Sequence, residues 1–182
     1  MESKSHPYPA LARLTVAGYF DGVLPDQSVL DSLSPDKNLW SPRRGCFVSI
    51  KTLDGDLRGC IGTIMAARDN LGLEIMANAV SAAVRDPRFK PMTAGELAGV
   101  VFSVDVLGVP EAVDSLDQLD PVRWGVIVSK GGRRGLLLPD LEGVDTVEKQ
   151  LGIAARKAGL TAFSDLTVER FSVERFAEQG RG

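Results

Sequence analysis

The chain has one histidine, His6, among 182 residues. The Ser-His-Asp and Cys-His arrangements of hydrolases need a histidine base beside the nucleophile, and a histidine metal site needs more than one ring. We expect His6 to lie in a short N-terminal tail. The sequence therefore argues against both kinds of hydrolytic site, unless this tail folds back over the nucleophile. No cofactor or metal site is expected.

Cysteine is also scarce, with only Cys46 and Cys60 present. Their separation is unlike that of paired zinc ligands. In the hairpin described below they lie about 10 Å apart along the ladder, too far for a disulfide. Two free thiols suit a reducing compartment, and the segment Met1–Pro9 lacks the hydrophobic stretch of a signal peptide. We expect a cytoplasmic protein.

Two further features are missing: a hydrophobic run long enough to span a bilayer, and an excess of basic charge. The net charge is −3 and the sequence pI is about 5.2, so nucleic acid is not favoured as a partner and no membrane contact is expected. Hydrophobic residues make up 44% of the chain and charged residues 25%. These proportions are typical of one globular domain, or of two small lobes that fold together.

The most informative segment is Leu57–Thr63, Leu-Arg-Gly-Cys-Ile-Gly-Thr. An Asp54-Gly55 turn separates it from the alternating run Gly45–Lys51, and this pattern predicts a β-hairpin. Residues two apart on a strand share a face, so Arg58 and Cys60 are expected to point the same way. The glycines of the segment weaken a strand and usually mark a bulge or the close approach of another group.

Helical and extended patterns alternate without regular βαβ crossovers, which predicts an α+β fold with antiparallel sheets and flanking helices. The expected elements after the surface loop Leu24–Pro42 and the hairpin are a strand over Val100–Leu107, a second hairpin over Val126–Leu138 and a last strand over Thr167–Phe176. The expected helices are Pro7–Asp21, a segment from Asn70 to about Arg85, and a segment from Asp145 to about Ala158.

Cys60 has two interpretations. A neighbouring cation such as Arg58 would favour the thiolate and make Cys60 a nucleophile or redox group. Alternatively, Cys60 is a small residue packed into a tight hairpin. Arg58 could bind a carboxylate or phosphate of a ligand, or it could pair with Asp86 or Glu74.

The second helix carries a polar stripe formed by Glu74, Asn78, Ser81 and Arg85. Such a stripe on an otherwise apolar helix is expected to face water or a cleft. Glu74 and Asn78 therefore either line a cleft beside the hairpin or belong to the solvated surface.

Asp86-Pro87 ends this helix. Arg88, which follows, either reaches the same cleft or belongs to a capped turn in which Phe89 plugs the core. The segment Gly131–Gly135 has neither the dinucleotide fingerprint nor the P-loop lysine pattern, so a hairpin turn is expected there rather than a phosphate site.

Several segments in order resemble the AMMECR family, in particular the prokaryotic branch named AmmeMemoRadiSam system protein A. The resemblance covers about His6 to Phe176. It is carried by Gly45–Val48, Leu57–Thr63, Ala77–Ala83, Asp86–Phe89, Val104–Leu107, Gly135–Pro139 and Lys157–Leu160. We expect one two-lobed domain over residues 7–176, with flexible tails over 1–6 and 177–182.

The resemblance implies a larger lobe made from both chain ends, a smaller lobe, and a hairpin that lies between them. It implies a functional association with a Memo-like protein and a radical-SAM protein, but it supplies no reaction. One hypothesis is an accessory protein that binds a small anionic ligand or a protein partner at this cleft. The other is a thiol-dependent enzyme with Cys60 as the reactive group and Arg58 as the anion holder. The expected ligand-binding residues are Arg58, Gly59, Cys60, Gly62, Thr63, Glu74, Asn78 and Arg88.

Overall fold

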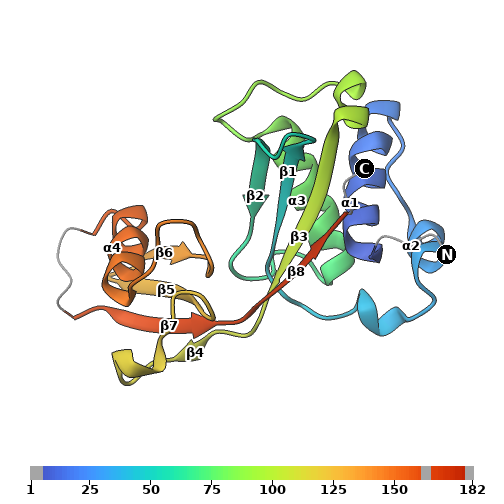
Figure 1. Ribbon diagram of the computed structural model, residues 1–182. Helices are drawn as coiled ribbons and strands as arrows, with labels where there is room; N and C mark the ends of the chain where they lie inside the picture. Colours follow the sequence, from blue (N-terminus) through green and yellow to red (C-terminus); the bar gives the residue numbers. More distant parts are fainter. Residues whose placement is uncertain (1–5, 161–164, 179–182) are drawn as a thin grey trace. The chain divides into compact units, whose positions relative to one another are not determined.

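The computed structural model describes residues 6–160 and 165–178 and confirms the α+β fold (Figure 1). Two four-stranded antiparallel sheets have the strand orders β2-β1-β3-β8 and β4-β7-β5-β6. The chain divides into two compact units. Unit 1 runs up to Val106 and resumes at Arg175, and unit 2 is Leu107–Glu174. The larger unit is therefore built from both chain ends, as expected.

Unit 1 contains most of the helical residues. Its elements are α1 (Pro7–Asp21), α2 (Gln27–Leu33), η1 (Lys37–Leu39), β1 (Cys46–Thr52), β2 (Leu57–Gly62), α3 (Leu71–Val84), η2 (Ala94–Gly99), β3 (Val100–Leu107) and the end of β8 (Val173–Ala177). The elements of unit 2 are β4 (Glu111–Ala112), η3 (Leu116–Gln118), β5 (Gly125–Lys130), β6 (Arg133–Leu137), α4 (Val147–Lys157) and β7 (Thr167–Phe171). No helix in the described residues is long and apolar enough to cross a bilayer.

Two of the expected elements were wrong. The segment Leu24–Pro42 is not only a loop, because Asp26 caps α2 by accepting the backbone N–H groups of Ser28 and Val29. The expected strand Thr167–Phe176 is divided at Ser172 into β7 and β8, which belong to different sheets. A single extended run thus contributes to both units, which its residue pattern did not indicate.

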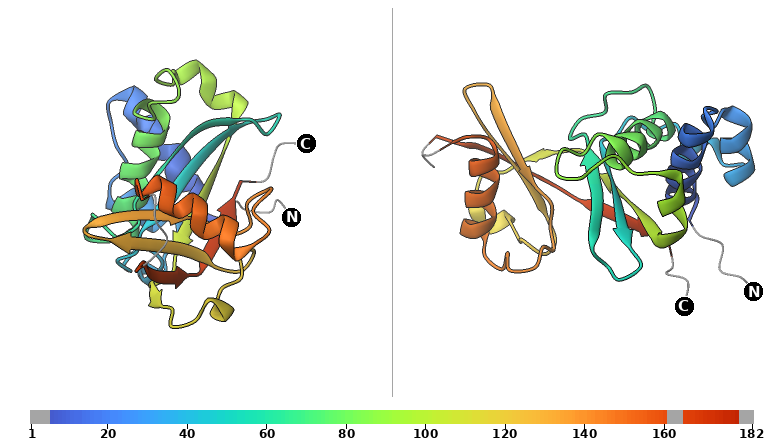
Figure 2. Two further views of the ribbon diagram at one scale, coloured as in Figure 1. Left: turned by 90° about the vertical axis from the view of Figure 1, so that its left-hand side faces the viewer. Right: turned by 90° about the horizontal axis from the view of Figure 1, so that it is seen from above.

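In unit 1, α1 and α3 pack against each other and cover one face of the sheet (Figure 2). Leu11 of α1, Ile75 of α3 and Phe102 of β3 are almost completely buried in this core. Cys46, Val48 and Ile50 alternate along β1 and point into the same core, whereas Phe47 and Ser49 point to the opposite face.

Both ends of the described chain are anchored, which corrects part of the expected tails. The ring of His6 stacks on Phe176 with centroids 4.1 Å apart, and partial burial lowers the pKa of His6. Glu178 forms an ion pair with Arg13 at 2.7 Å and accepts the N–H of Phe102 at 2.8 Å. Residues 1–5 and 179–182 of the expected tails lie outside the described residues.

In unit 2, α4 packs against β5 and β6, and the turn between these strands is the predicted glycine turn. Gly131 and Gly132 both adopt positive φ angles there. Arg133 donates to the Gly159 carbonyl oxygen at 2.8 Å, and Arg134 forms an ion pair with Glu169. These arginines have protein partners, which supports the interpretation as a hairpin turn.

The sheet and α3 approach each other closely at Gly59. A Cβ atom at this position would overlap the backbone carbonyl oxygen of Ala82. Gly59 pairs with Ile50, whose side chain points into the core, so Gly59 faces α3. The expectation of a close approach at this glycine is confirmed.

Gly59→Ala is expected to lower the free energy of unfolding by about 2–3 kcal/mol, because β2 or α3 must move to accommodate the methyl group. Urea unfolding measures this change. Gly95→Ala is the control, since a Cβ at Gly95 meets nothing within 4 Å. Equal stabilities of the two variants would contradict the close approach.

Candidate functional site

The β1–β2 hairpin is regularly paired at Cys60 and has a β-bulge at Arg58. Ser49 lies opposite Cys60, and Ile50 lies opposite Gly59. The next pair is Lys51 with Leu57, so Arg58 is an extra residue between two paired positions. The simple alternation that placed Arg58 and Cys60 on one face is therefore interrupted, and the two side chains have separate partners.

Cys60 lies on the face of the sheet opposite α3, because its neighbour Gly59 faces the helix. Its side chain is half-buried, and its Sγ accepts a hydrogen bond from Ser49 Oγ at 3.2 Å. Cys46 points into the core, where burial raises the pKa of its thiol to about 12. Both cysteines are free, as expected from their separation along the hairpin.

The backbone of Cys60 is bound by the segment that follows α3. The Cys60 N–H donates to Asp86 Oδ2 at 2.9 Å, and Arg88 Nη2 donates to the Cys60 carbonyl oxygen at 3.1 Å. β2 is an edge strand, so these two side chains satisfy backbone groups that a further strand would otherwise bind. The Asp86–Arg88 segment thus closes the outer edge of the sheet at Cys60.

Asp86 and Arg88 also form a two-point ion pair. Arg88 Nε donates to Asp86 Oδ1 at 2.9 Å and Arg88 Nη2 donates to Oδ2 at 2.6 Å. The Asp86 side chain is only 2% exposed, whereas that of Arg88 is 54% exposed. The hydrogen bonds from Arg88, and then that from the Cys60 N–H, hold the pKa of Asp86 well below its usual range. The capped turn expected at Arg88 fits this geometry, whereas Phe89 is only half-buried and does not belong to the core.

Arg58 is engaged by residues that the sequence did not suggest. Its Nε donates to Glu96 Oε1 at 2.8 Å, and its Nη2 donates to the Lys90 carbonyl oxygen at 3.1 Å. Arg58 does form an ion pair, which was one of its two interpretations, but the partner is Glu96 and not Asp86 or Glu74. Hydrogen bonds from Arg58, followed by the Thr93 N–H, lower the pKa of Glu96. Arg58 Nη1 is buried and has no partner among the described residues.

The polar stripe of α3 does not face water along its first half, which corrects the expectation. Glu74 and Asn78 are 1% and 4% exposed. Glu74 accepts hydrogen bonds from Thr63 Oγ1 at 2.6 Å and from the N–H groups of Ala67 and Arg68 at 2.8 Å. Asn78 Nδ2 donates to the Cys46 carbonyl oxygen at 3.0 Å. These side chains tie the segment after β2 to α3.

Gly62 also has a structural reason to be glycine, because a Cβ there would overlap the ring of Phe47. Of the expected ligand-binding residues, Gly59, Gly62, Thr63, Glu74 and Asn78 therefore contact neighbouring protein atoms. A binding role for these residues stays a prediction, as does the position of the hairpin relative to unit 2. In the described part of the chain, no group of three or more His, Cys, Asp or Glu could hold a metal ion.

A family model described as AMMECR1 matches residues 10–179. The chain belongs to the AMMECR1 family. A Thermotoga maritima protein is 48% identical over 175 residues, which cover 94% of this chain and 97% of the relative. A Clostridium acetobutylicum protein is 44% identical over 177 residues, which cover 97% of this chain and 37% of that longer relative.

Among solved structures, an uncharacterised protein from Pyrococcus horikoshii has a TM-score of 0.84 to this chain at 29% identity. The match covers 97% of this chain and 92% of the Pyrococcus chain. The names of the Thermotoga and Pyrococcus proteins state no activity.

Sequence reasoning missed two residues of this AMMECR1 site, Ser49 and Glu96. Ser49 could have been found from the hairpin register, because that register brings it opposite Cys60. Glu96 closes a capping box at the start of η2, where its Oε2 accepts the Thr93 N–H at 2.7 Å. Its other oxygen binds Arg58, 38 residues away in sequence, and local spacing carries no signal for this contact.

Asp86→Asn is expected to lower the free energy of unfolding at pH 7 by about 2 kcal/mol, because a charge-assisted pair at a buried carboxylate is lost. The pKa of Asp86 is lower in the folded state than in the unfolded chain, where it is about 3.9. The ionised carboxylate therefore contributes fully to the free energy of unfolding above that pH. That contribution is lost as the pH falls further toward the folded pKa. The difference between wild type and variant should shrink below about pH 4 in urea titrations at several pH values.

Asp56→Asn, at an exposed position of the same hairpin, is the control and should change stability by less than about 0.5 kcal/mol. A constant difference between wild type and Asp86→Asn from pH 7 to pH 2.5 would contradict the role assigned to the carboxylate.

Proposed function

We propose that this chain is a cytoplasmic accessory protein of the AmmeMemoRadiSam system, which binds a protein partner at the hairpin around Arg58 and Cys60. The partner is a Memo-like protein or a radical-SAM protein. The observation that carries the proposal is that the charged groups of the motif are already occupied. Arg58 is paired with Glu96 and Arg88 with Asp86, so the charge of each guanidinium is already balanced by a carboxylate of the chain.

The surface around Cys60 has the character of a protein contact. Directly opposed residues of an antiparallel pair share a face, so Ser49, Lys51, Leu57 and Cys60 lie together on the side away from α3. Leu57 is 38% exposed and Leu53, in the adjoining turn, is 56% exposed. Exposed leucines beside a half-buried thiol favour an apolar contact with a polar rim. We call the surface formed by Ser49, Lys51, Leu57 and Cys60 the hairpin face.

The Clostridium relative adds independent support for a partnership. The region similar to this chain is 37% of that relative, so the AMMECR1 part is there joined to a further length of chain. Domains that act together are often linked in one polypeptide in some organisms and separate in others. The identity of the partner rests on the family resemblance alone.

Leu57→Asp is expected to weaken binding of purified Memo-like or radical-SAM protein from the same genome at least tenfold, because a charge replaces an apolar contact. Surface plasmon resonance measures both affinities. Val122→Asp, at an exposed apolar position of unit 2, should bind like wild type. Absence of binding to either partner, or equal binding by Leu57→Asp, would overturn the proposal, provided that thermal unfolding shows the variant to be folded.

One observation favours the second candidate, a thiol-dependent enzyme. The Cys60 thiol is only half-buried, and its Sγ accepts a hydrogen bond from Ser49 Oγ on the face away from α3. However, the contacts described for Sγ include no base, and His6 Nδ1 accepts the Tyr8 N–H. We therefore rank the enzyme below the binding protein.

Alkylation separates the two candidates. For a binding protein, Cys60 should react with iodoacetamide at pH 7.5 no faster than glutathione, and buried Cys46 should react only on unfolding. Mass spectrometry of the labelled peptides gives both rates. Labelling of Cys60 at more than about tenfold the glutathione rate would favour the enzyme instead.

A further inference from the structure

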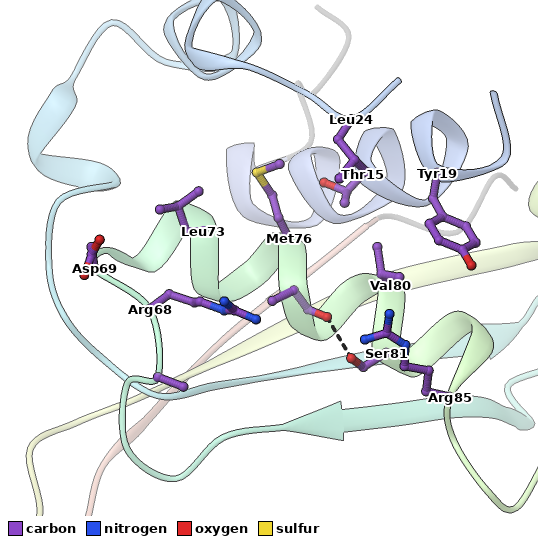
Figure 3. Close-up of a pocket in the computed structure, with 12 residues that line it drawn as sticks. Thr15, Tyr19, Leu24, Arg68, Asp69, Leu73, Met76, Val80, Ser81 and Arg85 are labelled. Atoms are coloured by element: carbon purple, nitrogen blue, oxygen red, sulfur yellow. Dashed lines mark hydrogen bonds between the residues drawn. The ribbon is translucent and has the colours of Figure 1, made fainter. Parts of the chain in front are cut away.

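A groove lies between α1 and α3 of unit 1, on the side of α3 that faces away from the sheet (Figure 3). Its volume is about 610 Å³, within the range of small-molecule sites. The residues that line it are Thr15, Tyr19, Leu24, Ala67, Arg68, Asp69, Leu73, Met76, Ala77, Val80, Ser81 and Arg85. All of them belong to unit 1, and we call this hollow the α1–α3 groove.

The groove and the hairpin face are separated by α3 and by the sheet that α3 covers. Ala79, Ala82 and Ala83 of α3 are buried toward the sheet. Leu73, Met76, Ala77 and Val80 follow one another at spacings of three, one and three, and form the floor of the groove on the other side of the helix. A ligand here does not touch the hairpin face, so the inference does not depend on the proposed function.

Two arginines mark the ends of this apolar floor. Arg68 precedes α3 and Arg85 ends it, and Figure 3 shows the guanidinium groups pointing toward each other along the helix. Neither side chain has a hydrogen bond or ion pair with any described residue. This contrasts with Arg13, Arg58 and Arg88, which are paired with carboxylates. Two unpaired guanidinium groups that converge on one hollow are suited to bind anions.

The remaining polar groups leave the guanidinium donors available to a ligand. Ser81 Oγ donates to the Ala77 carbonyl oxygen at 2.9 Å. Asp69 is the acidic residue of the lining, and Figure 3 shows its carboxylate at the outer end of the groove, directed away from the Arg68 guanidinium. Tyr19 lies near the Arg85 end and brings a further hydroxyl group.

The Arg68 end is held in place by buried structure. The N–H groups of Ala67 and Arg68 both donate to Glu74 Oε2 at 2.8 Å, and Asn70 caps α3 by accepting the Leu73 N–H at 2.9 Å. The backbone that carries Arg68 is thus fixed before any ligand arrives, which lowers the entropy cost of binding.

We propose that the α1–α3 groove binds a small organic dianion, in which two carboxylate or phosphate groups flank an apolar body. Arg68 binds one anionic group and Arg85 the other, while Leu73, Met76 and Val80 contact the body. The 14 residues of α3 span about 21 Å, and the two inward-pointing side chains shorten the distance that the ligand has to bridge.

Isothermal titration calorimetry with linear α,ω-dicarboxylates of eight to sixteen carbons tests this geometry. Affinity is expected to pass through a maximum at one chain length. At that length the dicarboxylate should bind at least tenfold more tightly than the monocarboxylate, which corresponds to about 1.4 kcal/mol, and the diol should not bind measurably. The matching α,ω-bisphosphate shows whether phosphate or carboxylate is preferred.

Arg68→Gln and Arg85→Gln should each weaken dicarboxylate binding about tenfold, to the level of the monocarboxylate. Arg43→Gln is the matched control, because Arg43 is an exposed arginine of unit 1 outside the groove. Leu57→Asp should also bind the dicarboxylate like wild type, so failure of this proposal and failure of the partner proposal are distinguishable. Circular dichroism confirms that each variant is folded.

Three results would overturn the proposal. The first is that no dianion of either series binds. The second is that the dicarboxylate binds no more tightly than the monocarboxylate. The third is that Arg68→Gln and Arg85→Gln bind like Arg43→Gln.

Discussion

The structure of unit 1 depends on the close approach of β2 to α3 at Gly59. At this point a strand backbone lies against the carbonyl oxygen of Ala82, with no side chain between them. The contact turns Cys60 to the opposite face of the sheet. It also brings the segment after α3 beside the edge strand, where Asp86 and Arg88 bind the Cys60 backbone. The position of Cys60 is therefore fixed by the contact of Gly59 with α3 and by the binding of Asp86 and Arg88 at the edge of the sheet.

Arginine serves two different purposes in this unit. Arg13, Arg58 and Arg88 are each paired with a carboxylate and connect segments far apart in the sequence or close a strand edge. Arg68 and Arg85 have no such partner among the described residues and line the α1–α3 groove. An unpaired guanidinium beside apolar surface is available to a ligand, whereas a paired one loses its hydrogen bonds when it binds elsewhere. This distinction is the basis of the two proposals, anion binding at the α1–α3 groove and protein binding at the hairpin face.

Most helices and strands could be predicted because their signals are local. Pro7–Asp21 was predicted with the bounds that the structure has, since proline in the first turn and an apolar stripe define it. The Asp54-Gly55 turn correctly predicted the β1–β2 hairpin. The bulge at Arg58 was not predicted, because whether an extra residue is accommodated depends on the neighbouring strand and helix. Glu74 and Asn78 were expected on a stripe that faces water or a cleft, because their burial depends on segments that only the tertiary structure brings beside α3. Thr63 and Cys46 are the residues to which they bind there.

The sequence by itself determined the α+β class, the two hairpins and the free state of both cysteines. These follow from composition and from contacts between residues close in the chain. Only the tertiary structure decided which charged groups are paired, which side of α3 is buried and where the unpaired arginines converge. A guanidinium takes its partner from whatever carboxylate the fold brings within reach, as Glu96 is brought to Arg58, and spacing along the chain does not encode that distance.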